Sequence, residues 1–204
     1  MTTHTLVQTI AVRRDNIWTV RAASVLFITA LTTAAAQISV PLPLTTVPFT
    51  FQPMVVLLGG LALGSRLGAT SQVLYLAAGI AGLPVFAASP ALPPGALRLF
   101  GPTGGYLMAY PFAAFLVGYL AERGMDRRYL TSVIAMIVGL IVVYACGALW
   151  LGLFARTAAG NASVGLQSAV MSGVAPFVAA DIAKLLMAAA IVPGLWRIVG
   201  RAGR

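Results

Sequence analysis

Apolar stretches long enough to cross a bilayer follow one another along this 204-residue chain, and they restrict its fold more than any other feature. Hydrophobic residues make up 60% of the chain and charged residues only 8%, whereas charged residues make up about 25% of ordinary soluble domains. Inside a bilayer the backbone must satisfy its own hydrogen bonds, which favours helices for stretches of this length. The sequence therefore predicts an all-α integral membrane protein.

We predict a bundle of six transmembrane helices. The second span is short for a bilayer core that roughly 20 residues cross, so we expect it to be tilted, broken or extended by its flanks. Two loops rich in proline and glycine (39–53 and 87–100) and a charged hairpin (Glu122–Arg128) interrupt the apolar sequence. The predicted spans are 22–38, 54–63, 69–86, 101–121, 129–153 and 170–196.

Arginines are distributed unevenly among the predicted loops. With a cytoplasmic N-terminus, nearly all of them fall on the cytoplasmic side, and only Arg98 and Arg156 fall outside. Under the positive-inside rule this asymmetry places both termini in the cytoplasm. The predicted organisation is a cytoplasmic tail (1–21), a transmembrane substrate-binding domain (22–196) and a basic cytoplasmic tail (197–204).

The N-terminal region has two other possible interpretations. Ala34-Ala35-Ala36 before Gln37 could be a signal-peptidase site, and Arg13-Arg14 could begin a twin-arginine signal. Asp15 and Asn16 follow those arginines where such a signal needs apolar residues, and the apolar run is long enough to span. A first membrane helix is the favoured interpretation.

An acid and a lysine lie three residues apart inside the last predicted span. On a helix Asp181 and Lys184 share a face and can pair. A charge at mid-membrane depth costs roughly 2.5–3.5 kcal/mol, so an unpaired charge facing lipid is disfavoured. The pair is either part of a ligand site or an ion pair that fastens this helix to its neighbours.

Several unusual features fall on the same predicted side of the membrane. At about 1.5 Å per residue from Arg197, Lys184 lies roughly 20 Å and Asp181 roughly 24 Å from the cytoplasmic edge, which is the outer half of the core. Gln52 in the proline-rich loop, the loop with Arg98 and the turn at 101–106 share that side. We therefore predict an outward-facing ligand pocket.

Each further candidate in this pocket also has a purely structural interpretation. Free N–H groups at the helix start near Gly105 suit an oxygen acceptor, but glycine there also permits close helix packing. Thr103 could bind a ligand or act as an N-cap, and Tyr106 could pack on an apolar ligand or belong to the interfacial aromatic belt. Arg98 has the chemistry to bind a carboxylate.

Residue counts argue against catalysis and metal binding. Cys146 is the only cysteine, interpreted as a packing residue, and His4 is the only histidine, so neither a disulfide nor a histidine or thiolate metal site can form in the membrane. Asp181 is the only acid in the predicted spans, and no phosphate-binding loop is present. The net charge of +9 comes from scattered arginines. We expect no enzyme, cofactor, metal or nucleic-acid partner.

Four segments together carry a family resemblance. They are Pro41–Gln52, GIAGLPVF at Gly79–Phe86, GPTGGY at Gly101–Tyr106 and PFVAADIAK at Pro176–Lys184. In these segments the chain resembles the BioY family, the biotin-capturing S components of energy-coupling factor (ECF) transporters. The resemblance extends from the first span to the last. It implies a six-helix protein of the bacterial plasma membrane that takes biotin from outside and depends on a transmembrane coupling subunit and two cytoplasmic ATPases.

The resemblance also implies roles for individual residues. Asp181 and Lys184 would meet the ureido ring of biotin, and an arginine or a helix N-terminus would meet its carboxylate. The loop Ala87–Pro94 departs from the glycine-rich pattern common in the family, which leaves the partner of the carboxylate open. The implied biotin-binding residues are Asp181, Lys184, Thr103, Gly105, Tyr106, Gln52 and Arg98.

Ala30 and Ala34 form a small-xxx-small pair on the first predicted helix, which would let another helix approach closely. By resemblance this pair contacts the coupling subunit, and internal packing is the alternative. An S component for another vitamin and a non-transporting membrane scaffold are the alternative functions. The sequence leaves open whether the chain works alone, as a homo-oligomer or with the ATPase module.

Overall fold

The structure is a computed structural model that describes residues 17–42, 45–88, 94–155 and 164–201. Most of the predicted N-terminal tail (1–16), Arg156 and the final residues 202–204 lie outside the described residues. The described chain is mostly helical. In order, the elements are α2 (Ile17–Gln37), β1 (Ser39–Val40), β2 (Phe49–Thr50), α3 (Gln52–Leu63), α4 (Ser65–Ile80), η1 (Gly95–Phe100), α5 (Gly104–Leu120), η2 (Ala121–Met125), α6 (Tyr129–Leu153), α7 (Leu166–Gly173), α8 (Ala175–Ala188) and α9 (Ile191–Arg201).

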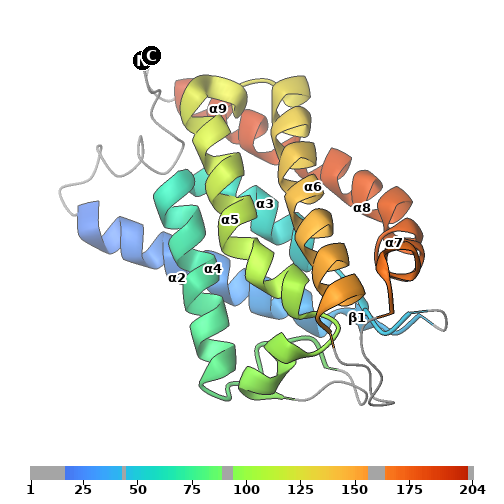
Figure 1. Ribbon diagram of the computed structural model, residues 1–204. Coiled ribbons are helices and arrows are strands. Elements are labelled where there is room, and N and C mark those ends of the chain that lie inside the picture. The colour runs from blue at the N-terminus through green and yellow to red at the C-terminus, as the bar shows by residue number, and fades with distance from the viewer. Residues whose placement is uncertain (1–16, 43–44, 89–93, 156–163, 202–204) are drawn as a thin grey trace.

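Helix α5 lies at the centre of the bundle, against α3, α4 and α6, while α2 crosses the others at a steep inclination (Figure 1). Small residues allow this close approach. A Cβ added at Gly60 would stand 2.5 Å from the Ala114 carbonyl oxygen, and one added at Gly118 would collide with the backbone at Gly64. The central helix is therefore packed backbone to backbone against α3 and the start of α4.

Among the described residues, four helical stretches are long and apolar enough to cross a membrane: Ile17–Gln37, Gly104–Met125, Tyr129–Leu153 and Ala175–Ile198. Helices α3 and α4 have 12 and 16 residues, fewer than the roughly 20 that a straight span requires. A mainly helical membrane fold is confirmed, and the six-span count stays a prediction.

The predicted third span ends earlier than expected. Helix α4 stops at Ile80 instead of residue 86, because Gly82 adopts a φ of 93° that other residues rarely take. The Leu83 N–H then donates to the Ala78 carbonyl at 3.1 Å, and Pro84 has no N–H to continue a helix. The GLPVF segment is therefore a loop, and it delivers Phe86 to the interior.

The predicted sixth span is not continuous. Helices α7, α8 and α9 are separated at Val174 and at residues 189–190. Pro176 falls in the first turn of α8, and Pro193 lacks the N–H that would bond the Ala189 carbonyl, so neither favours an unbroken helix. The break at Val174 leaves the neighbouring Gly173 carbonyl available to another partner.

The proline-rich segment is extended, as predicted from its composition. β1 and β2 pair antiparallel, with Ser39 opposite Thr50 and Val40 opposite Phe49. Of the prolines in this segment that the structure describes, only Pro53 enters a helix, in the first turn of α3, where a missing N–H is tolerated.

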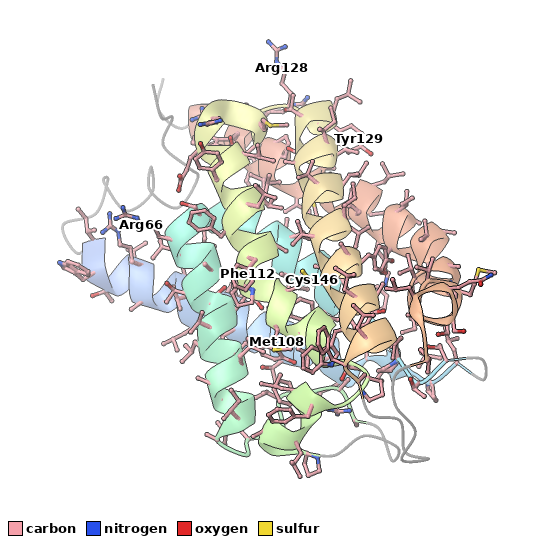
Figure 2. The ribbon with its side chains drawn as sticks, viewed as in Figure 1. Arg66, Met108, Phe112, Arg128, Tyr129 and Cys146 are labelled. Atoms are coloured by element: carbon pink, nitrogen blue, oxygen red, sulfur yellow. The ribbon has the colours of Figure 1, made fainter. Side chains whose placement is uncertain are left out.

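The interpretation of Cys146 as a packing residue is wrong. Its side chain is exposed on α6, on the outer face of the bundle with Phe112 of α5 (Figure 2). One residue further, Gly147 faces inward against the Tyr106 ring. Helical rotation places adjacent residues about 100° apart, which explains the opposite environments.

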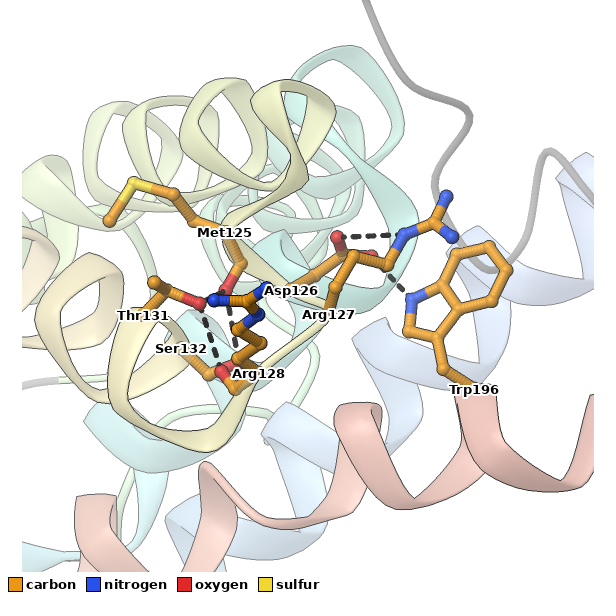
Figure 3. Close-up of polar contacts among 7 residues, drawn as sticks. All are labelled: Met125, Asp126, Arg127, Arg128, Thr131, Ser132 and Trp196. Atoms are coloured by element: carbon orange, nitrogen blue, oxygen red, sulfur yellow. Dashed lines mark hydrogen bonds and ion pairs between the residues drawn. The ribbon is translucent and has the colours of Figure 1, made fainter. Parts of the chain in front are cut away.

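The α5–α6 hairpin and α9 lie at the end of the bundle opposite η1 and β1 (Figure 1). A polar cluster joins them (Figure 3): Trp196 donates from Nε1 to Asp126 Oδ2 at 2.6 Å, and Arg127 Nε lies 3.5 Å from Oδ1. The Arg127 guanidinium also stacks 3.6 Å from the Trp196 ring centroid. Burial raises the pKa of Asp126 above its ordinary value, opposed by these two partners.

Candidate functional site

A cavity opens between the β2–α3 segment, η1, and helices α5, α6 and α8. About 610 Å³ of space, open solvent included, lies between its walls. Within the described ranges no three His, Cys, Asp or Glu side chains gather where they could hold a metal ion. Polar side chains in the wall are Thr50, Gln52, Arg98, Thr103, Tyr106, Tyr110, Tyr144 and Asp181, and the apolar wall includes Val47, Pro48, Pro53, Phe86, Leu107, Val143 and Phe177.

Asp181 lines this cavity and forms an ion pair with Lys184 one turn along α8. Both side chains are buried. Lys184 also donates to the Thr50 carbonyl at 2.7 Å and lies 3.8 Å from the Phe49 ring centroid. The predicted pairing is confirmed. The lysine stands behind the aspartate, tying α8 to β2, and it does not itself line the wall.

Gln52 is held in the cavity wall by a short polar chain. Its Nε2 donates to the Tyr75 hydroxyl at 2.6 Å, which in turn donates to the Val85 carbonyl at 3.0 Å. The Thr50 hydroxyl donates to Gln52 Oε1 at 3.3 Å. The side chain predicted at this position therefore reaches the site in a fixed orientation, supported from α4.

Arg98 lines the cavity from η1 with 5% of its surface exposed. One guanidinium nitrogen donates to the Ala87 carbonyl, while Nε and Nη1 are buried with no partner among the described residues. Burial lowers the pKa of Arg98 below its ordinary value, and an anion beside it would act in the opposite sense. Two free donors on a buried cation suit a carboxylate.

Thr103 holds the N-cap position of α5, but its side chain makes no capping bond. Its Oγ1 is instead buried at the cavity wall without a partner in the described structure. The Tyr106 ring lines the same wall, and its hydroxyl donates to the Gly173 carbonyl at 2.8 Å. The Tyr106 ring can thus contact a ligand, while its hydroxyl group bonds the backbone beside the break between α7 and α8.

Gly105 faces α6 and is not among the residues that form the described wall. A Cβ at this position would overlap the Trp150 side chain and stand 2.6 Å from the Cys146 carbonyl oxygen. Trp150 in turn donates to the Gly101 carbonyl at 3.0 Å. The geometry gives Gly105 a packing role, and a direct ligand contact stays a prediction.

Two tyrosines in the wall were missed from the sequence. Tyr144 donates its hydroxyl to Asp181 Oδ2 at 2.6 Å, and Tyr110 lies buried beside the cavity. Their positions in the sequence could have indicated them, because both lie in the middle of an apolar span. Tyrosines of membrane proteins usually lie near the ends of a span, at the membrane interface. The sequence does not show whether these side chains face the interior of the bundle, because that depends on how the neighbouring helices pack.

Ala30 and Ala34 are exposed on α2, on the face that also presents Leu26 and Phe27. No other helix in the described part of the chain covers their side chains. Internal packing, the alternative for this pair, does not account for them.

A sequence model described as the BioY family matches residues 5–201. The chain is 41% identical over 166 residues to "Probable biotin transporter BioY" of Pyrococcus horikoshii, covering 81% of this chain and 90% of that protein. It is 38% identical over 164 residues to "Biotin transporter BioY" of Thermotoga maritima, covering 80% and 88%. A crystal structure of the S-component for biotin from an ECF-type ABC transporter superposes with a TM-score of 0.78 at 26% identity, covering 90% of this chain and 94% of that one.

We expect Gly105→Ala to destabilise the protein by roughly 1–3 kcal/mol, because the added methyl group must displace Trp150 or the α6 backbone. Thermal unfolding in detergent measures this. Gly194→Ala is the matched control, since nothing lies within 4 Å of its added Cβ; in helix α9 it is expected to be neutral or to stabilise by up to about 1 kcal/mol. A Gly105→Ala protein as stable as the wild type would contradict the packing role.

Proposed function

The chain belongs to the BioY family, and on that premise we propose that it is the biotin-binding S component of an ECF-type uptake transporter in the bacterial plasma membrane. The observation that carries the proposal is the distribution of charge in the cavity. A carboxylate from α8 and a cation with free donors from η1 enter one largely apolar space from different walls. Biotin likewise joins a polar ring to a carboxylate through an apolar chain.

The ureido ring of biotin binds at Asp181. Its two N–H groups need acceptors, and a carboxylate offers several lone pairs beyond those used by Lys184 and Tyr144. Gln52 supplies a further polar group held in place by Tyr75. Lys184 lies behind the carboxylate and acts as its counter-ion.

The valerate carboxylate binds at Arg98, with Thr103 beside it. Both contribute buried polar atoms that lack partners in the described structure, and burying such atoms is costly unless a ligand completes them. The rings of Phe86, Phe177 and Tyr106 supply the apolar wall for the thiophane ring and chain.

The cavity faces the outside, and both chain termini are cytoplasmic. The arginines of the α5–α6 hairpin lie at the end of the bundle opposite η1, which agrees with the positive-inside rule for this orientation. Helices α3 and α4 serve as the second and third of six spans, and their short length is accommodated by packing on α5.

Ala30 and Ala34 dock the transmembrane coupling subunit, which links the protein to two ATPases. Support comes from their exposure on α2 and from the apolar side chains beside them. Small residues allow a helix of the partner to approach the α2 backbone closely.

The purified protein is expected to bind biotin, as measured by titration calorimetry. Asp181→Ala and Lys184→Ala should each weaken binding by at least roughly 1–3 kcal/mol, because each leaves a buried charged partner unsatisfied. Neither heat nor thermal stabilisation with biotin in the wild type would refute the function. Tighter binding of another vitamin in a ligand panel would reassign the substrate.

Arg98→Met should weaken biotin binding by about 1.5–3 kcal/mol, the usual range for a hydrogen bond to a charged group. Biotinamide, which lacks the negative charge, should bind the variant and the wild type alike. Arg66→Met is the control, since Arg66 is exposed on α4. Equal losses for biotin and biotinamide would rule out a carboxylate contact.

Ala30→Leu combined with Ala34→Leu should lower biotin uptake about tenfold in cells that contain the coupling subunit and ATPases, because the bulkier residues prevent close helix approach. Binding by the purified variant should be unchanged. Ala179→Leu with Ala183→Leu is the matched control, a second exposed pair with the same spacing on α8. Normal uptake by the α2 variant would refute this docking surface.

A further inference from the structure

The carboxylate of Asp181 is held by two donors from different helices. Lys184, from α8 itself, pairs with Oδ1, and the Tyr144 hydroxyl of α6 donates to Oδ2 at 2.6 Å. Tyr144 is partly buried and lines the cavity beside Asp181. Each oxygen therefore has one protein partner, and the remaining lone pairs are left for a ligand.

The two donors differ in how far they restrain the rotation of the Asp181 carboxylate. Lys184 contacts only one oxygen, and a single contact permits the carboxylate to turn about its bond to the chain. Tyrosine has a rigid ring, and a bond from it to the second oxygen restrains that rotation. The α6 helix places this ring firmly, because Gly147 one turn along is packed against the Tyr106 ring.

We propose that Tyr144 is a positioning residue for ligand recognition: it sets the plane of the Asp181 carboxylate so that its free lone pairs meet a pair of N–H donors, as in a cyclic urea. The inference rests on the proposed function, because it concerns the recognition of the ureido ring. The contact with Lys184 alone does not fix the orientation of the Asp181 carboxylate.

The test compares the binding of biotin with that of 1′-N-methylbiotin, in which a methyl group replaces the hydrogen of one ureido N–H. In Tyr144→Phe we expect biotin binding to weaken about tenfold and binding of the methylated analogue to weaken less, so that discrimination between the two falls. Tyr129→Phe is the matched control. Tyr129 also lies on α6 and donates to α8, at the Leu186 carbonyl over 3.1 Å, but it is exposed and outside the described wall. It should leave both affinities unchanged.

Thermal unfolding of both variants in detergent separates recognition from folding. A parallel loss of affinity for both ligands, or no loss at all, would overturn the inference and leave Tyr144 as a tie between α6 and α8. If Tyr144→Phe does not yield folded protein, Tyr144→Met removes the same hydroxyl and is judged by the same ratio. Failure of the wild type to bind biotin would instead refute the proposed function.

Discussion

The ion pair between Asp181 and Lys184 is the interaction on which the arrangement of the cavity depends. Neither charge is stable alone at this depth in a membrane protein, so each requires the other and further polar partners. Those partners come from distant parts of the chain: the Thr50 carbonyl from β2 and the Tyr144 hydroxyl from α6. Satisfying one buried pair therefore brings three segments together around the cavity.

Close helix packing performs the second task, which is to hold the walls at a fixed separation. Gly105 lets α5 meet α6 at Trp150, and Gly147 accommodates the Tyr106 ring. The Tyr106 hydroxyl then reaches Gly173, beside the break that separates α7 from α8. Interruptions of the helices consequently serve the site, because a continuous last span would have no free carbonyl there.

Polar atoms divide into those that the protein satisfies and those that it leaves open. Gln52 and Asp181 each have protein partners, Tyr75 for the amide and Lys184 and Tyr144 for the carboxylate. Arg98 and Thr103 keep buried atoms without partners in the described structure. Unpaired buried groups are unusual in native proteins, and three of the five such side-chain atoms in the described structure, those of Arg98 and Thr103, lie at this cavity, where a ligand can complete them.

The sequence by itself determined the membrane class, the mainly helical fold, the extended proline-rich segment and the pairing of Asp181 with Lys184, because these follow from composition, proline chemistry and the cost of a lone charge in lipid. It did not reveal the breaks at Ile80 and Val174 or the exposure of Cys146, which depend on which face of each helix meets a neighbour. Only the tertiary structure placed Lys184 behind Asp181, turned Gly105 toward α6 and brought Tyr144 to the carboxylate. Tyr144 and Asp181 are 37 positions apart in the sequence. Helix packing decides which residues so far apart meet, and local sequence patterns do not predict it.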